Sequence, residues 1–77
     1  MSNRDRQIDM ILRHMREQGS ITQREALQDY GIARLASRIN DIRKTGIPVA
    51  TIVETARNRY GAPVHYARYE LGGRVNG

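Results

Sequence analysis

The chain contains no cysteine, tryptophan or phenylalanine, and only two prolines among its 77 residues. Without cysteine, neither a disulfide framework nor a thiolate zinc site can supplement the core. A domain of this length buries only roughly 60% of its unfolded surface, so its core is thin. No apolar run approaches the roughly 20 residues that span a bilayer. The polar segment SNRDRQIDM near the start predicts no secretory signal. We therefore expect one small cytoplasmic domain over residues 1–77 that does not enter a membrane.

The sequence also lacks the motifs of common enzymes. It has no glycine-rich phosphate loop, nucleophile elbow or Glu-x-x-His pair. The two histidines, His14 and His65, are distant in sequence and have no cysteine partners, so no metal site is expected. Ser37 has no evident general base. We expect no enzymatic activity, no cofactor and no small-molecule substrate.

The net charge of +5 is unevenly distributed along the chain. Residues 1–32 carry five basic and five acidic side chains, whereas residues 33–77 carry eight basic and three acidic ones. The whole positive excess therefore lies in the second part. Such asymmetry predicts a polyanionic partner. The alternative is a well-solvated surface that keeps a small domain soluble.

Apolar residues at helical spacing predict a first helix over residues 4–18, with Ser2 or Asn3 as its cap and Gly19 as its end. A second helix is predicted over residues 23–30. It would open with a capping box formed by Thr22 and Glu25, would place Ala26, Leu27 and Tyr30 on one face, and would close at Gly31.

A third helix is predicted over residues 33–45, with Gly46 after it. Its inner side would carry Leu35, Ala36, Ile39 and Ile42. Beyond it the spacing becomes strand-like. Residues 49–55 and 64–71 predict a β-hairpin, with turn formers in the segment between them. A short third strand at 20–22 would support the hairpin. The predicted fold is α+β, with an ordered core over 4–71 and a loose tail over 72–77.

Two segments carry a resemblance to a known family. Residues 20–46 are SITQREALQDYGIARLASRINDIRKTG, and residues 67–71 are ARYEL. Together with the order of elements, they resemble small phage- and prophage-associated winged helix-turn-helix domains, over about residues 4–71. The resemblance implies three helices with a C-terminal hairpin, the wing. It also implies a DNA-binding role, as a regulator of transcription or a recombination factor.

The side chains expected to contact double-stranded DNA lie on the third helix and the wing. Arg34 and Ser37 would occupy the base-reading half of the third helix, and Asn40 would reach further along the groove. Lys44 and Arg24 would contact phosphates. In the wing, basic side chains would follow the backbone or enter the minor groove. The full set is Arg24, Arg34, Ser37, Arg38, Asn40, Lys44, Arg57 and Arg59.

Several alternatives stay open. Arg38 and Arg43 flank the apolar stripe of the third helix, so each has both a structural and a DNA-facing interpretation. Arg38 has Asp41 three residues on, within ion-pair range on a helix. A protein-interaction module on a winged scaffold is the main competing function. RNA binding is less favoured because four tyrosines offer no clear stacking platform. Homodimerisation also stays open, since so small a domain would bind DNA weakly alone.

Overall fold

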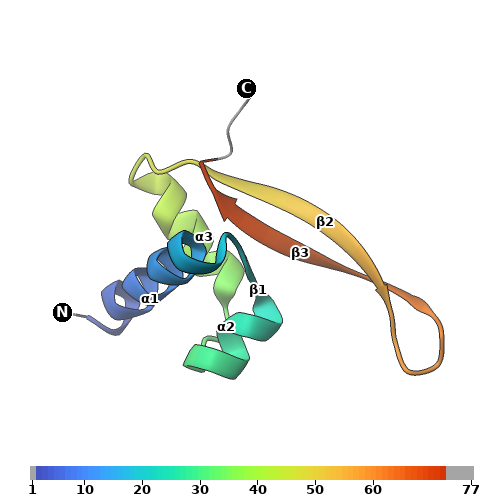
Figure 1. Ribbon diagram of the computed structural model, residues 1–77. Coiled ribbons are helices and arrows are strands. Elements are labelled where there is room, and N and C mark those ends of the chain that lie inside the picture. The colour runs from blue at the N-terminus through green and yellow to red at the C-terminus, as the bar shows by residue number, and fades with distance from the viewer. Residues whose placement is uncertain (1, 73–77) are drawn as a thin grey trace.

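A computed structural model describes residues 2–72. Three helices and three strands follow one another in the order α1 (Asn3–Gln18), β1 (Ile21–Thr22), α2 (Gln23–Tyr30), α3 (Leu35–Lys44), β2 (Val49–Arg57) and β3 (Pro63–Leu71). The strands form one antiparallel sheet in the order β1-β3-β2, beside the three helices (Figure 1). The predicted α+β fold and the short third strand are confirmed. Of the loose tail expected over 72–77, only Gly72 is described, and its amide donates to the Pro48 carbonyl at 3.0 Å; residues 73–77 lie outside the described residues.

Local signals set the ends of α1 and α2 as the sequence predicts. Ser2 is the cap of α1, and its side chain accepts a hydrogen bond from the Asp5 amide at 3.1 Å. The capping box of α2 is complete. Thr22 Oγ1 accepts from the Glu25 amide, and Glu25 Oε1 accepts from the Thr22 amide at 2.9 Å. Gly31 closes α2 with a φ of 69°, a left-handed conformation that costs glycine little.

The third helix is shorter than predicted, running over Leu35–Lys44 instead of 33–45. The reason is the side chain of Gln23, at the start of α2. Its Nε2 donates to the Ile32 carbonyl at 2.8 Å, and its Oε1 accepts from the Leu35 amide at 3.0 Å. The Leu35 amide is thus satisfied by a side chain twelve residues earlier. Arg34 consequently stays outside the helix, with φ −120° and ψ 61°.

The core lies where the three helices meet the inner end of the sheet. Its fully buried large side chains come from α1, β1, the corner between α2 and α3, and α3. They are Ile11, Met15, Ile21, Ile32, Leu35, Ile39 and Ile42. Tyr69 and Leu71 of β3 pack against this cluster from the sheet. The core is thin, as expected for 77 residues.

Ala36, predicted to face the core, does not, and neither does Leu27, which was predicted on one face with Ala26 and Tyr30. Leu27 of α2 is 55% exposed, and Ala36 of α3 is exposed as well. Both lie at the edge of an apolar stripe, where helical spacing alone does not decide whether a side chain faces the core or the surface. Ala26 and Leu35 take the central positions, with no exposed surface. Leu27 and Ala36 therefore belong to the surface.

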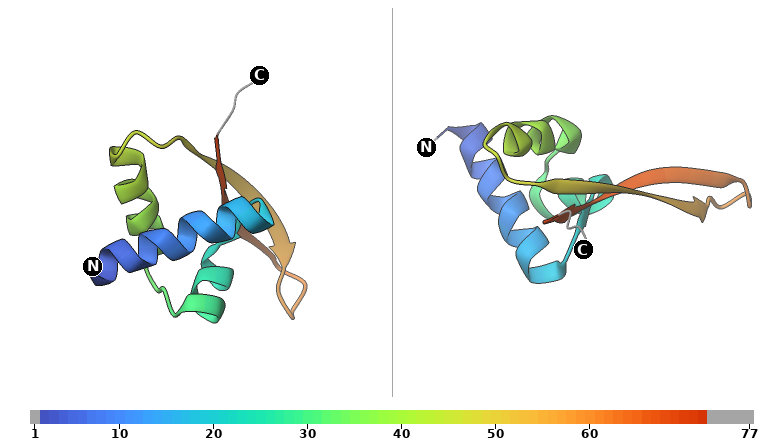
Figure 2. Two further views of the ribbon diagram at one scale, coloured as in Figure 1. Left: turned by 60° about the vertical axis from the view of Figure 1, so that its left-hand side comes forward. Right: turned by 90° about the horizontal axis from the view of Figure 1, so that it is seen from above.

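The hairpin is longer than predicted, with strands over 49–57 and 63–71 instead of 49–55 and 64–71. Its turn is confined to residues 58–62, because Asn58 Oδ1 accepts from the amides of both Tyr60 and Ala62. Pairing consequently extends to Arg57 opposite Pro63. The outer part of the hairpin, over residues 53–67, forms an arm that projects beyond the helices (Figure 2).

None of the helices among residues 2–72 is both long enough and apolar enough to cross a membrane.

Replacing Gln23 by alanine tests the bridge that starts α3. Gln23→Ala leaves the Leu35 amide and the Ile32 carbonyl without their partner, so we expect a loss of about 1–2 kcal/mol in unfolding free energy. Urea denaturation followed by circular dichroism measures it. The matched control is Gln28→Ala, an exposed position of the same helix. Equal unfolding free energies for the two variants would contradict the bridge.

Candidate nucleic-acid interface

A groove of about 680 Å³ separates the starts of α2 and α3 from the hairpin arm. One wall comes from the helices, with Gln23, Arg24, Leu35 and Ala36. The other wall comes from both strands of the hairpin. Its residues are Ala56, Arg57, Asn58, Val64, Tyr66, Ala67, Arg68 and Tyr69, and Thr22 and Glu25 complete the lining. The groove exists because Gln23 fixes the start of α3 beside that of α2, and because the turn begins only at Asn58.

Two of the predicted contact residues meet at this groove. Arg24 lies in the first turn of α2, and Arg57 is the last residue of β2, yet both line the groove. Nothing in their sequence positions indicates that they would lie on one surface. Both side chains are exposed. The groove therefore carries a cation on each of its two walls.

The outward face of α3 carries three of the other candidates. With Leu35, Ile39 and Ile42 buried, a rotation of about 100° per residue turns Ser37, Asn40 and Lys44 away from the core. Asn40 and Lys44 are exposed, and Ser37 is half-buried. Arg34 is exposed but precedes the helix as its cap residue, without a side-chain capping bond. The predicted position of Arg34 within the helix is therefore wrong.

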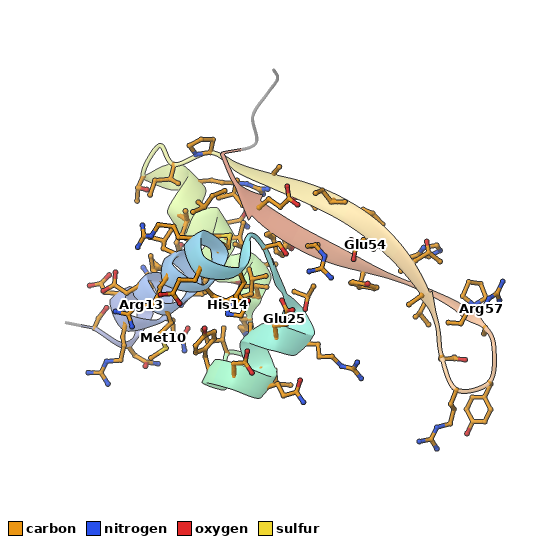
Figure 3. All side chains as sticks on the ribbon, viewed as in Figure 1. Met10, Arg13, His14, Glu25, Glu54 and Arg57 are labelled. Atoms are coloured by element: carbon orange, nitrogen blue, oxygen red, sulfur yellow. The ribbon has the colours of Figure 1, made fainter. Side chains whose placement is uncertain are left out.

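The tip of the arm is held in one shape by its own side chains. Arg57 Nη1 donates to the Gly61 carbonyl at 2.6 Å, across the turn. Asn58 Oδ1 binds the amides of Tyr60 and Ala62 on the inside. Arg59 is exposed, and Tyr60 is 84% exposed. Arg57 therefore shapes the tip, while Arg59 and Tyr60 project from it; Figure 3 shows the tip far from the helices.

Arg38 and Arg43 both make contacts within the protein. Arg38 Nε lies 3.1 Å from Asp41 Oδ2, and its side chain is only 20% exposed. Arg4 of α1 approaches the same carboxylate oxygen at 3.7 Å, so Asp41 links α3 to α1. Arg43 donates through Nη2 to the Val49 carbonyl at 2.8 Å and to Thr51 Oγ1 at 2.7 Å. These contacts favour the structural interpretation of both arginines, and a DNA contact by Arg38 stays a prediction.

A polar network on the groove side of β3 was not foreseen from the sequence. Arg68 Nε donates to Glu54 Oε1 at 2.9 Å, and Arg68 Nη1 donates to Ser20 Oγ at 2.9 Å. Ser20 and Arg68 are 48 residues apart, so only the pairing of β1 with β3 brings them together. The sequence shows only that Ser20 and Arg68 each stand next to a core-facing residue, and this alternation does not reveal that they are partners. Arg68 is thus neutralised in place, unlike Arg24.

His14, considered in the sequence only as a metal ligand, is a buried residue of the helix junction. Its Nδ1 lies 2.7 Å from the Tyr30 hydroxyl, and its Nε2 lies 3.7 Å from Glu25 Oε1 (Figure 3). Burial, followed by the charge of Asp29, raises the pKa of Tyr30 above 10.0. Among residues 2–72, no three His, Cys, Asp or Glu side chains are grouped to hold a metal ion. The contacts tie α1 to α2.

The remaining cations divide into two groups. Within the described part of the chain, acidic side chains pair with Arg4, Arg38 and Arg68, whereas Arg43 donates to the Val49 carbonyl and Thr51 Oγ1. Five of the proposed contact residues have no such acidic partner among residues 2–72. These are Arg24, Arg34, Lys44, Arg57 and Arg59. Arg6, Arg13 and Arg16 on α1 are also unpaired there, but α1 balances them with acidic neighbours. The positive excess therefore lies on α3 and the arm, and Arg24 at the start of α2 adds an unpaired cation beside them.

Comparison with known families finds one match. A family described as "Winged helix-turn-helix domain" matches residues 6–74, which is most of the chain. This description agrees with the three helices, the sheet order and the arm described above. No curated protein and no solved structure matches the chain. The family indicates nucleic-acid binding, and it makes the groove and the face of α3 the candidate interface.

The Glu54 carboxylate provides a pH-dependent test of the network beside the groove. Hydrogen bonds from Tyr66 and then Arg68 hold the pKa of Glu54 below its ordinary value of 4.5. A pKa lowered on folding means that the carboxylate stabilises the fold above pH 4.5 and that this contribution is lost as pH falls through the folded-state pKa. We expect Glu54→Gln to lower the melting temperature at neutral pH, and we expect this difference from the wild type to shrink as the pH falls below 4.5.

Thermal melting of both proteins across this pH range measures the effect. Glu17→Gln serves as the control, because Glu17 is an exposed carboxylate of α1 without a hydrogen bond or ion pair among the described residues. A constant difference between the Glu54→Gln variant and the wild type at every pH would count against the network.

Proposed function

The chain belongs to the winged helix-turn-helix domain family, and on that premise we propose that it binds double-stranded DNA, with α3 in the major groove and the arm along the backbone. The major groove is about 12 Å wide and admits an α-helix. The observation that carries the proposal is the groove between α2, α3 and the arm, with Arg24 and Arg57 on facing walls. Such a groove accepts a phosphate backbone between two cations.

We assign the roles by position. Asn40 and Ser37 face outward from α3 and would contact base edges, and Arg34 would reach bases from just before the helix. An asparagine can bind the N6 and N7 groups of adenine, and an arginine can bind the O6 and N7 acceptors of guanine. Lys44, Arg24, Arg57 and Arg59 would contact phosphates. The phosphate contacts set the affinity and the base contacts set the sequence preference.

The setting remains part of the proposal. The sequence resemblance supports a phage or prophage regulator of transcription, or a recombination factor, acting in the cytoplasm where its DNA lies. The exposed Arg59 and Tyr60 at the tip suit a contact with the minor groove or the backbone beside it.

The salt dependence of binding tests the phosphate contacts. If about four to six phosphates are neutralised, the logarithm of the affinity should fall with the logarithm of salt concentration with a slope of roughly −4 to −5. We expect Arg59→Ala and Arg24→Ala each to weaken binding to every duplex and to make the slope shallower by about 1. Fluorescence anisotropy with a labelled duplex measures this.

Arg13→Ala is the matched control, because Arg13 is an exposed arginine of α1 at the opposite end of the molecule from the arm (Figure 3). Its slope should equal that of the wild type. No binding of the wild-type chain to any duplex at about 50 mM salt would rule out the proposed function.

Selection from a random duplex library tests the base contacts. We expect Asn40→Ala to lose the preference at one or two base positions, at a cost of about 1–3 kcal/mol for the preferred sequence, while binding to unrelated duplexes is unchanged. Arg34→Ala should relax a different position. If both variants select the wild-type sequence, α3 does not read bases as proposed.

A further inference from the structure

One long edge of the sheet has no partner in the described part of the chain. The strand order β1-β3-β2 leaves β2 at the margin of the sheet, paired only with β3 along its nine residues (Figure 1). Exposed edge strands are ready to pair with another chain, and natural proteins usually protect them with lysine, proline or a bulge. β2 reads VATIVETAR, which has no lysine and no proline, and it pairs with β3 without a break.

The register identifies which backbone groups of β2 point outward. The Gly72 amide donates to the Pro48 carbonyl at 3.0 Å, and the Asn58 amide donates to the Ala62 carbonyl at 3.0 Å. Because hydrogen-bonded and non-hydrogen-bonded pairs alternate along an antiparallel ladder, the even-numbered residues of β2 bond to β3. The amides and carbonyls of the odd-numbered residues face the free edge. Arg43 already occupies the Val49 carbonyl, which leaves the Val49 amide and the groups of Thr51, Val53, Thr55 and Arg57.

The sequence of the same edge is nearly symmetric about its middle residue. Residues 50–56 read ATIVETA, so Ala50 mirrors Ala56 and Thr51 mirrors Thr55 around Val53. Only Ile52 and Glu54 break the symmetry. The centre, Val53, is 70% exposed, and it is one of the residues whose backbone groups point outward. Val53 is therefore both the centre of the sequence symmetry and a residue whose backbone groups face the free edge.

We propose that two copies of this chain associate through β2, antiparallel, about a two-fold axis at Val53. In this register the two Val53 residues exchange their amide and carbonyl bonds, and Thr51 does the same with Thr55 of the other copy. The free groups at the centre of the edge are then used, the Val49 amide faces the Arg57 carbonyl of the other copy, and the two sheets become one continuous sheet.

The side chains fit this register. Paired threonines are favourable cross-strand neighbours, and the exposed valines meet at the axis. Glu54 falls opposite Ile52, so no like charges stand directly opposite each other. The Glu54 carboxylate is already bound by Arg68 at 2.9 Å, which limits repulsion between the two copies of Glu54. The symmetry favours a second copy over an unrelated strand, because only an identical strand repeats the mirrored pairs.

The association places two copies of α3 in a two-fold arrangement, which suits a DNA site with two inverted halves. It does not depend on DNA, however. Self-association can be measured with the protein alone, so a failure of DNA binding and a failure of dimerisation are separate results.

Sedimentation velocity over a range of concentrations tests the dimer. We expect the mass of two chains to appear with a dissociation constant below about 1 mM. Val53→Pro should abolish it, because proline removes an outward-facing amide that forms no bond within the monomer. Val53→Thr keeps this amide and a branched side chain, and should dimerise like the wild type. A single-chain mass for the wild type at about 1 mM would overturn the proposal, as would equal dimerisation of the Val53→Pro variant.

Introduced cysteines test the register without relying on that variant. The chain has no cysteine of its own, so each crosslink has one origin. Val53→Cys should form a disulfide-linked dimer under mild oxidation. Ala50→Cys and Ala56→Cys should not crosslink separately, because each lies several residues from its own copy, but a mixture of the two should. Crosslinking of Ala50→Cys or Ala56→Cys alone, or none by Val53→Cys and the mixture, would overturn the proposed pairing.

Discussion

The two hydrogen bonds of the Gln23 side chain determine where the third helix begins. Gln23 occupies the first position of α2, and it binds the Ile32 carbonyl on one side of the corner and the Leu35 amide on the other. One side chain thus connects the start of α2, the corner and the start of α3. Arg24, which follows Gln23 in the sequence, and Ala36, which follows Leu35, then line the same wall of the groove. The candidate interface depends on this connection more than on any cation within it.

The inner end of the hairpin stabilises the fold, and its outer part is free to bind a partner. Near its inner end, Val49, Tyr69 and Leu71 belong to the core or pack against it. Further out, the arm has lost contact with the helices and exposes both cations and apolar side chains, including Arg57, Arg59 and Val53. The change occurs because β1 is only two residues long and supports β3 at Thr22 and Ile21 alone. Beyond it, the arm offers one wall of the groove and the free edge of β2.

Local interactions could be predicted from the sequence, and interactions between distant residues could not. The caps of α1 and α2, the capping box of Thr22 and Glu25, and the turn at Gly31 depend on residues a few positions apart, and all were predicted. The start of α3 was not, because its first amide is bound by Gln23. Ala36 was assigned to the core, and Leu27 to the face of Ala26 and Tyr30, because their spacing fits. Which part of the chain packs against the edge of an apolar stripe depends on the fold, and both residues are exposed among residues 2–72.

The candidate site follows the same division. The residue types of α3 and the basic wing were evident from charge and spacing, whereas the meeting of Arg24 with Arg57 required the fold. Arg38 and Arg43 could not be resolved in advance, since their partners Asp41, Val49 and Thr51 include residues from the neighbouring strand. The charge distribution in the sequence indicated a polyanionic partner, and the fold now indicates which surface would bind it.

We propose that DNA lies across the outward face of α3 and the groove beside it. NMR can test this placement by titrating the isotopically labelled protein with a duplex and following its backbone amide signals. We expect the largest shifts on residues 23–24, 34–40 and 57–60, with little change along the exposed side of α1. Shifts concentrated on α1, with the arm and α3 unaffected, would contradict it.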